Sequence, residues 1–484
     1  MNFRDINALM AQRQRAFLDV SALAGETVYG NVSTLWKDMF ASRSNFLSAE
    51  NFNFFRHPSS AAVIGVGSQK DRNETTVLEE QVVPTVVDAH DIPDDVIAKI
   101  AEPLVGSPPV EPYRGNLFSS VFLHNVPPVW RVVQAVKQFG PTGRPLRVCE
   151  IGAGFGAGAL LLHQLLDIES YTIIDLPENL YMSSIFLPTA LGRSHNLVDP
   201  RDRETLKCGA QLNFTLPSFT DALDVRPFDL VWNRASMGEM PGGTAAAYIA
   251  WIKTHLAPDG IFHFANRFNV PRTNGAMRLS DFGLQHFDIR AITPMVRFAR
   301  PTNQIHSEIV AMPARGSGNI RPDYLDVIGD LTACGFDPQT VAFREAAVSG
   351  NLPADVTSAF DVLAAIFNTS SLQHKYDLLQ NPQSQSLGDI KPVLLTILEL
   401  LGGAEGPALV RKDEVLSLNL GYKLEIRLRG LYAEIEAKKL LPWRQTLQPF
   451  ASQSAQHTRM AEILVEQSNP AFSTRFMRDL RVAS

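Results

Sequence analysis

The chain has 484 residues, of which 45% are hydrophobic and 19% are charged. This composition is typical of a folded globular protein and excludes a largely disordered one, and the length predicts more than one domain. The formal net charge of -6 gives no general attraction to phosphate backbones, so a nucleic-acid-binding protein is not expected.

Cysteines and hydrophobic runs restrict the class of protein further. Cys149, Cys208 and Cys334 include no C-x-x-C pair, so neither a disulfide framework nor a zinc site is predicted. The amino terminus lacks a continuous apolar core, and no window reaches the roughly 18 apolar residues of a membrane span. We therefore expect a cytoplasmic protein without an export signal or a membrane span.

Residues 1–100 are expected to form a mostly helical cap or arm, since Leu35, Met39 and Phe40 recur at helical intervals. From about residue 146 the pattern changes to short β-rich runs that alternate with helical stretches, which is typical of a parallel α/β sheet. The predicted strands are LRVCEIG, SYTIID, FDLVWN, GIFHFANRF and QIHSEIVAM. Helices are predicted for GAGALLLHQLL and TAAAYIAWIKTHLAPDG, the second ending at Pro258 and Gly260.

A Gly/Pro/Arg-rich break at residues 313–321 ends the strand signal, so we predict domain boundaries of 101–315 for the α/β domain and 316–484 for a helical carboxy-terminal domain. In the last third, Leu424, Leu428, Leu431 and Ile435 recur at spacings of four, three and four residues. This spacing favours an amphipathic helix, and the alternation in YKLEIRLR leaves a strand as the alternative there.

The stretch EIGAGFGAG places glycines at 152, 154, 156 and 158, after an apolar strand and before an apolar helix. Such a turn lets the backbone approach a ligand, and the helix N-terminus adds a partial positive charge. The dinucleotide fingerprint G-x-G-x-x-G would need its third glycine at position 157, where Ala157 stands. Gly156 instead fits the acid-x-G-x-G-x-G spacing of a methyl-donor site.

Two acidic residues flank this turn. Glu150 suits a cationic amino group and repels a pyrophosphate, and Asp175, which ends the second strand, can accept hydrogen bonds from ribose hydroxyls. S-adenosylmethionine carries an amino group and a ribose but no phosphate. The sequence therefore predicts this cofactor in preference to NAD and to a purely structural turn.

The end of the FDLVWN strand supplies further candidates. Asn233 and Arg234 are placed to meet the methionine part of the donor or the acceptor, the alternative being that they tie loops together. LPSFTDALD, residues 216–224, is either a lining of the adenine or a surface loop. The predicted donor-binding residues are Glu150, Gly152, Ala153, Gly154, Gly156, Asp175, Leu176, Asn233 and Arg234.

Four segments together resemble the sugar O-methyltransferase family of bacteria, a branch of the class I S-adenosylmethionine-dependent methyltransferases. They are EIGAGFGAG, IIDLP, FDLVWNRASMGEM with the following YIAWI, and IHSEIV. The upstream NFLSAENFNFFR and EPLVGSPPVEPYRGNLFSS also look like the family's amino-terminal part, so the resemblance runs from about residue 35 to 312. Gly238 departs from the family's usual S-x-S-E-M loop, which puts a role for a hydroxyl there in doubt.

The resemblance implies an α/β fold, a Rossmann-like class I methyltransferase domain with a mostly helical N-terminal region. The additional helical C-terminal domain is predicted from its apolar spacing and has no counterpart in this resemblance. It implies transfer of a methyl group to a hydroxyl of a sugar or glycan. That reaction needs a general base, most often a histidine. His306 is the candidate base, with Glu308 or Glu239 orienting its imidazole or holding sugar hydroxyls, and the alternative is that His306 and Glu308 fill the polar edge of a strand.

Other predictions are negative or leave alternatives open. No metal is predicted, although Asp221, Asp224 and Glu239 could meet in space, and His263, His163 and His286 are interpreted as core histidines. A polyketide or phenolic acceptor, a non-catalytic interaction protein with this fold, and an NAD-dependent oxidoreductase are the alternatives to a sugar methyltransferase. The expected partners are a small-molecule or glycan substrate and a second copy of the chain, bound through the terminal helical regions.

Overall fold

A computed structural model of the chain describes residues 12–13, 15–41, 55–56, 87, 92–268, 278–294, 305–314, 322 and 325–326. The chain divides into two compact units, the first comprising 1–266 with 270–275 and the second 267–269 with 276–484. The boundaries predicted at 100 and 315 stay predictions. The helical domain predicted for 316–484 lies almost wholly outside the described residues.

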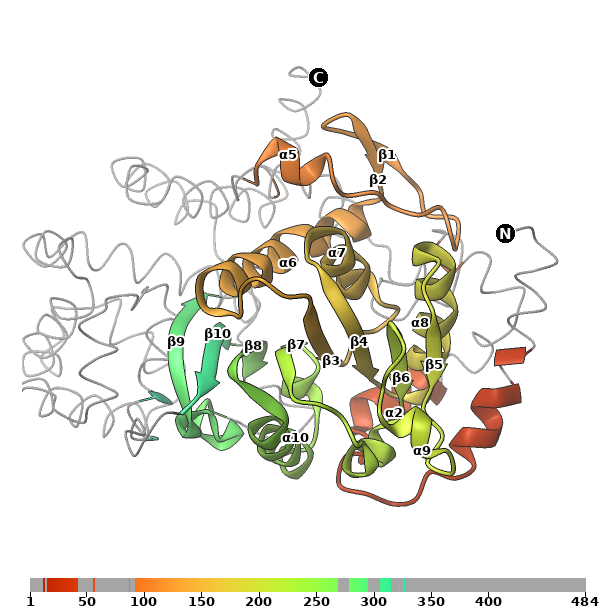
Figure 1. Cartoon of the computed structure of the whole chain (residues 1–484), viewed down its shortest axis with the longest axis vertical. Helices are drawn as coiled ribbons and strands as arrows, with labels where there is room; N and C mark the ends of the chain where they lie inside the picture. Colours follow the sequence, from red (N-terminus) through yellow and green to blue (C-terminus); the bar gives the residue numbers. More distant parts are fainter. Residues whose placement is uncertain are drawn as a thin grey trace, which may run out of the picture. The chain divides into compact units, whose positions relative to one another are not determined.

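The first unit contains a parallel sheet whose strands lie in the order β5-β6-β4-β3-β7-β8. Each neighbouring pair is parallel, and Figure 1 shows β3 between β4 and β7. The strands are β3 (Leu146–Ile151), β4 (Ile168–Ile174), β5 (His195–Leu197), β6 (Leu212–Thr215), β7 (Phe228–Arg234) and β8 (Leu256–Phe268). An open parallel sheet with helices between its strands is a Rossmann-like α/β fold, as predicted.

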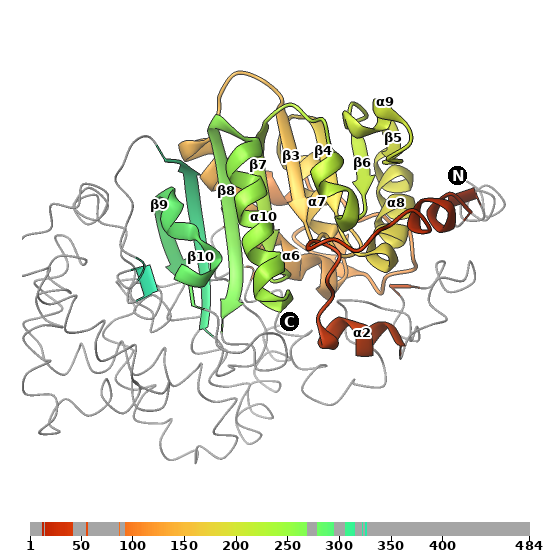
Figure 2. The ribbon, with the colours of Figure 1, turned by 90° about the horizontal axis from the view of Figure 1, so that it is seen from below.

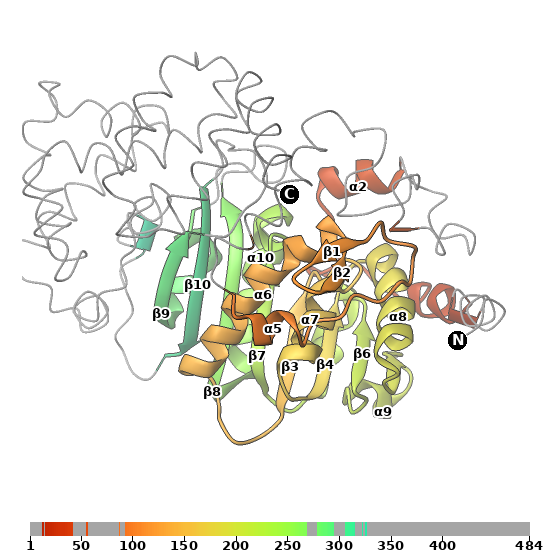
Figure 3. The same cartoon turned by 90° about the horizontal axis from the view of Figure 1, so that it is seen from above.

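Helices cover both faces of this sheet, which explains why its central strands are apolar on both sides. Figure 3 shows α6, α7 and α8 in front of the strands, and Figure 2 shows α10 on the opposite face. The helices are α2 (Thr34–Ala41), α5 (Asp94–Ile97), α6 (Ser120–Phe139), α7 (Ala157–Leu165), α8 (Pro177–Leu191), α9 (Arg203–Leu206) and α10 (Gly242–His255). No helix among the described residues is long and apolar enough to cross a membrane.

Shorter elements complete the first unit. A hairpin of β1 (Glu111–Tyr113) and β2 (Asn116–Phe118) lies between α5 and α6 in the chain, and the 3-10 helices η2 (Pro217–Ala222) and η3 (Met237–Glu239) follow β6 and β7. The stretch left open as adenine lining or surface loop is therefore mostly the 3-10 helix η2.

Helix α8 is buried on all its sides from Asn179 to Pro188. A helix that is apolar all round needs covering on every face. Part of that cover comes from the amino-terminal region, because the ring of Phe17 packs edge-on against Tyr181 at 6.2 Å between centroids. The amino-terminal residues are therefore part of the packing of the α/β unit.

The order in which strands are added to the sheet reverses at β3. β4 and β6 lie on one side of β3, and β7 and β8 lie on the other. Ligands of open α/β sheets bind outside the carboxyl ends of the strands at this switch point. The turn after β3 and the loop after β7 lie there. The fold thus brings together the two segments that the sequence marked for the donor.

The predicted strands LRVCEIG, SYTIID, FDLVWN and GIFHFANRF are confirmed as β3, β4, β7 and β8. The prediction that Pro258 and Gly260 end the preceding helix is wrong, because α10 ends at His255 and both residues lie in β8. The pairing of β7 with β8 shifts register between Phe228 and Leu230, and a Cβ on Gly260 would lie 2.8 Å from the Phe228 carbonyl oxygen. Proline and glycine here accommodate a bulge rather than a helix end.

The second unit contains an antiparallel pair, β9 (Phe287–Pro294) and β10 (Ile305–Pro313), and the short helices η4 (Ser280–Phe282) and η5 (Leu284–His286). The strand predicted for QIHSEIVAM is confirmed as β10. Its register against β9 shifts between Val310 and Ala311. The hydroxyl of Ser280 donates to Asp326 Oδ2 at 2.7 Å, which fixes η4 to a residue further along the chain.

A buried carboxylate fixes the amino ends of β3 and β7. Asp229 is fully buried and accepts from the Arg147 backbone amide at 2.8 Å and from Arg144 Nη2 at 2.6 Å. Burial alone would raise the pKa of Asp229, but hydrogen bonds from Arg144 and Arg147 lower it below its ordinary value. The carboxylate therefore stabilises the fold in full above about pH 4, the ordinary value in the unfolded chain, and this contribution is lost as the pH falls below that value through the lowered pKa of the folded state.

We expect Asp229→Asn to lower the free energy of unfolding by about 2 kcal/mol at pH 7, because two arginines lose a buried anionic partner. Denaturation in urea measures the change. Glu169→Gln is the control, since the Glu169 pair with Arg226 is exposed and should contribute less than about 0.5 kcal/mol. Equal losses for the two variants would contradict the assignment.

Candidate functional site

The glycine turn between β3 and α7 has a backbone that only glycine adopts easily. Gly152, Gly154 and Gly156 have φ values of +80°, +59° and +98°. A Cβ on Gly152 would lie 2.1 Å from Ser236 Oγ, and one on Gly156 would lie 2.8 Å from a methyl carbon of Leu187. Gly152 and Gly156 are thus required by both conformation and close approach, and Gly154 by conformation alone. At Gly154 a Cβ would meet nothing within 4 Å.

Asp175 follows β4 and fastens this turn from beside it. Its Oδ2 accepts from the Gly154 amide at 2.8 Å, and its Oδ1 accepts from the Leu176 amide at 2.7 Å and from Asn179 at 3.0 Å. Burial raises the pKa of Asp175 to about 6, against the opposing effect of these hydrogen bonds. The structure thus places Asp175 and Leu176 next to the predicted donor turn.

Glu150 lies beneath the turn in a buried polar chain. Tyr171 Oη donates to Glu150 Oε2 at 2.7 Å, and Trp232 Nε1 donates to Tyr171 Oη at 2.7 Å. Only 4% of Glu150 is exposed, and this burial raises its pKa to about 8. Although the Tyr171 hydrogen bond and the charge of Arg234 oppose this shift, the carboxyl group is mostly protonated at neutral pH, rather than the anion that the sequence suggested.

Asn233 and Asn266 join the ends of β7 and β8 to the turn through buried amides. Asn233 Nδ2 donates to the Ile151 carbonyl at 2.5 Å, and Asn266 Nδ2 donates to Asn233 Oδ1 at 2.7 Å. Asn266 Oδ1 accepts from the Gly238 amide at 2.9 Å. This network holds the loop after β7 against the end of β3, a role that the sequence left as the alternative for Asn233.

Arg234 is directed to helix α6. Its Nη1 donates to Asn125 Oδ1 at 2.7 Å, and Asn125 donates to the Val121 carbonyl at 2.8 Å. Ala235, the next residue, has a φ of +66° and donates to the Ala265 carbonyl at 2.7 Å. The geometry gives Asn233 and Arg234 structural partners, and their assignment to the donor stays a prediction.

An amino-terminal segment reaches the loops after β6 and β7, which the sequence did not indicate. Trp36 Nε1 donates to Glu239 Oε2 at 3.0 Å, and Tyr29 Oη donates to Asp221 Oδ1 at 2.8 Å. Thr244, in the first turn of α10, donates to the Val28 carbonyl at 2.7 Å. Glu239 thus shares its carboxylate with α2, and no local sequence pattern signals contacts over about two hundred residues.

His306 and Glu308 both lie in β10, in the second unit. Glu308 is 5% exposed and pairs in register with Thr293 of β9. The side chain of His306 lies outside the described residues. Glu239 belongs to the first unit, so the grouping of these three residues as a catalytic set stays a prediction.

The histidines interpreted as core residues have different outcomes. His263 is buried between its neighbours in β8, as predicted. His163 is half-buried beside Tyr171, with ring centroids 5.3 Å apart, and burial lowers its pKa to about 4. His286 is exposed at the end of η5, so that interpretation was wrong. Among the described side chains no three His, Cys, Asp or Glu residues form a group that could hold a metal ion.

Comparison with known proteins gives no match to a protein-family model and none to a curated protein. Among solved structures, TehB from Haemophilus influenzae is 14% identical with a TM-score of 0.29, over 38% of this chain and 62% of that one. A TehB-like S-adenosylmethionine-dependent methyltransferase from Corynebacterium glutamicum is 15% identical with a TM-score of 0.26, over 38% and 86%. An O-methyltransferase family 2 protein from Planctomyces limnophilus, in complex with apigenin, is 12% identical with a TM-score of 0.27, over 40% and 61%. The chain spans less than two thirds of the first and the third.

Glu150→Gln should make the protein more stable, and more so as the pH rises. The raised pKa means that the folded protein keeps the Glu150 proton up to about pH 8, whereas the unfolded chain releases it near about pH 4. The contribution of the neutral Glu150 carboxyl group to the stability of the wild type is therefore fully present below about pH 4 and is lost as the pH rises through about 8. Glutamine cannot ionise, and its amide oxygen can still accept from Tyr171.

We expect the free energy of unfolding of Glu150→Gln to be higher than that of the wild type by about 3 kcal/mol at pH 8 and by much less at pH 5. Urea denaturation at both values measures the difference. Glu169→Gln, at an exposed position, should follow the wild type at both. A gain for Glu150→Gln that does not grow with pH would contradict a protonated buried carboxyl group.

Proposed function

We propose that this protein is an S-adenosylmethionine-dependent O-methyltransferase that acts on a hydroxyl of a sugar or glycan. The observation that carries the proposal is the glycine turn at the switch point of the sheet, fastened by Asp175 and underlain by Glu150. These features lie where open α/β sheets bind ligands.

The chemistry of the turn favours this donor over a dinucleotide. Glu150 and Asp175 are both buried beside the turn. The Asp175 carboxylate opposes a pyrophosphate, and the two carboxyl groups together suit a ligand that carries an ammonium group and a ribose. An ammonium group bound near Glu150 would favour the carboxylate form of Glu150 and offset the free-energy cost of burying its charge. The open space on the Cβ side of Gly154 leaves room for a ligand against the backbone.

Each residue of the turn then has a role in binding. Asp175 accepts hydrogen bonds from ribose hydroxyls through lone pairs that its three protein donors leave free. Gly152, Ala153, Gly154 and Gly156 bring backbone against the methionine part, while Asn233 and Arg234 fix the loop beside it. Leu176, which starts α8, contributes a side chain near the ribose and adenine.

When bound, the donor supplies a methyl group on a sulfonium sulfur, which is a good leaving group. The protein's task is therefore to align the acceptor oxygen with that methyl group and to remove the hydroxyl proton. His306 accepts this proton at an imidazole nitrogen, and Glu308 or Glu239 orients the ring or holds neighbouring hydroxyls. The resemblance of IHSEIV and NRASMGEM to the sugar O-methyltransferase family supports these roles.

Asp175→Asn should weaken the binding of S-adenosylmethionine about tenfold or more, because an amide has one acceptor oxygen where the carboxylate has two. Isothermal calorimetry measures the dissociation constant. Asp199→Asn is the matched control, since Asp199 pairs with Arg201 at the surface and should bind as the wild type does. If the wild type binds no S-adenosylmethionine, the proposed function is wrong.

Methyl transfer itself is tested on a panel of nucleotide sugars, glycans, phenols and polyketides, with the methyl gain read by mass spectrometry. We expect a sugar to gain one methyl group, and His306→Ala to retain donor binding but lose turnover. His286→Ala, at the exposed histidine, is the control; if His306→Ala keeps full turnover, the base is another residue.

A further inference from the structure

An ion pair formed by two distant segments is buried close to the donor turn. Arg56 and Glu102 form a salt bridge in which their side chains are 2% and 0% exposed. Arg56 Nη1 also donates to the Pro103 carbonyl at 3.0 Å. Burial lowers the pKa of Arg56 to about 10, so the guanidinium remains charged at neutral pH.

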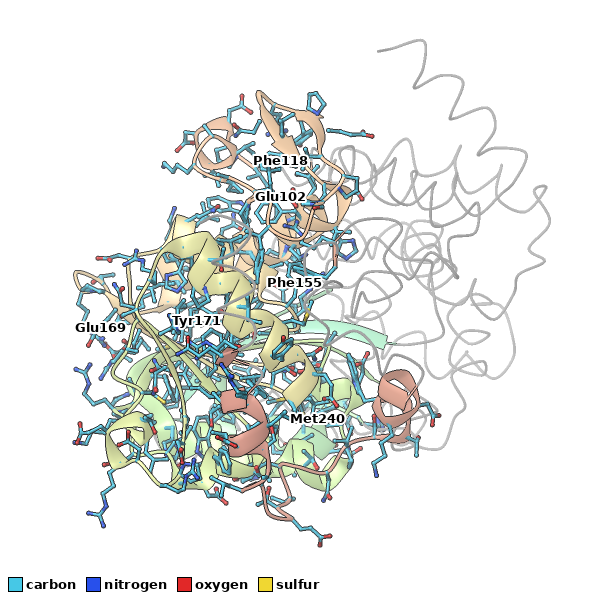
Figure 4. All side chains as sticks on the ribbon, turned by 90° about the vertical axis from the view of Figure 1, so that its right-hand side faces the viewer. Glu102, Phe118, Phe155, Glu169, Tyr171 and Met240 are labelled. Atoms are coloured by element: carbon cyan, nitrogen blue, oxygen red, sulfur yellow. The ribbon has the colours of Figure 1, made fainter. Side chains whose placement is uncertain are left out.

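The guanidinium of Arg56 also contacts the donor turn through an aromatic ring. Its central carbon lies 5.5 Å from the ring centroid of Phe155 and 5.6 Å from that of Phe186. Phe155 stands between Gly154 and Gly156, and Figure 4 labels it together with Glu102. Phe55 packs edge-on against both rings, at 5.6 Å and 6.0 Å.

Glu102 connects the same cluster to helix α6. Its carboxylate accepts from the backbone amide of Ser119 and from Ser119 Oγ, the latter at 2.6 Å. Ser119 caps α6 by accepting from the Phe122 amide at 3.2 Å. Since α6 packs on α7 and its Asn125 accepts from Arg234, this cluster is joined to both sides of the candidate site.

The fit of residues 55–56 depends on Gly106. The Arg56 amide donates to the Gly106 carbonyl at 2.9 Å. Gly106 has a φ of +84°, and a Cβ there would lie 2.5 Å from Phe55 Cε1. A methyl group at this position would therefore displace the Phe55 ring without removing any charge.

A buried ion pair adds little net stability compared with apolar residues of the same volume. The free-energy cost of desolvating the two charges is explained if the pair serves to fix a geometry. A guanidinium held over the ring of Phe155 fixes the position of that ring and of the turn that carries it. We propose that Arg56 is a positioning residue for the donor turn: held by Glu102, it keeps Phe155, and with it Gly154 and Gly156, in the conformation that receives the donor. This inference rests on the proposed function.

The test compares Arg56→Met, Arg56→Lys and Gly106→Ala with Arg147→Met, which removes a mostly buried arginine from the opposite end of β3. Calorimetry gives the dissociation constant for S-adenosylmethionine below each variant's melting temperature. We expect Arg56→Met and Gly106→Ala to weaken binding about tenfold or more, Arg56→Lys to weaken it less because the charge is kept, and Arg147→Met to bind within about twofold of the wild type. If Arg56→Met does not fold, Arg56→Lys and Gly106→Ala decide the outcome.

Amide hydrogen exchange in the free protein separates the two proposals. We expect residues 152–158 to exchange faster in Arg56→Met and Gly106→Ala, but not in Arg147→Met. Unchanged exchange and unchanged affinity in the Arg56 and Gly106 variants would overturn the positioning role. A weakening by Arg147→Met as large as that by Arg56→Met would overturn it also, by showing a general loss of stability. A wild type that binds no donor defeats the proposed function, and the exchange measurement then still decides the role of Arg56.

Discussion

The candidate site depends on the close approach of two strand ends, the turn after β3 and the loop after β7. Gly152 has no room for a side chain because Ser236 occupies the space, and the amide of Asn233 bonds to the Ile151 carbonyl across the gap. Asp175 holds the other side of the same turn through the Gly154 amide. Once the parallel sheet forms, these contacts restrict the conformation of the turn from both sides.

Polar groups that the sequence marks as functional also serve the structure. Asp175 accepts from the turn, Asn233 joins two strands, and Arg234 donates to α6, so a change at any of them alters the geometry of the site in addition to the contact proposed with the ligand. Glu150 instead destabilises the fold when it is ionised, since burial raises its pKa to about 8. Binding sites commonly keep such unfavourable groups because the ligand relieves them.

Local sequence patterns predicted most strands of the first unit and its glycine turn, but they could not predict contacts between residues that are distant in the sequence. The strands β3, β4, β7 and β8 and the glycine turn are set by hydrophobic runs and by φ values that only glycine adopts easily, both of which can be read from neighbouring residues. The helix end predicted at Pro258 and Gly260 was wrong because proline and glycine occur both at helix ends and at strand bulges. The partners of Arg56 and of Trp36 lie 46 and 203 residues away, and no periodicity encodes them.

The contacts of the amino-terminal region have a consequence for how the chain reaches its native state. Val28, Tyr29 and Trp36 bond to partners between 192 and 216 residues later in the chain. Contacts of such sequence separation close large loops and slow folding. During synthesis the first segment leaves the ribosome long before Asp221, Glu239 and Thr244 exist, so the loops after β6 and β7 gain their amino-terminal cover only at a late stage of folding.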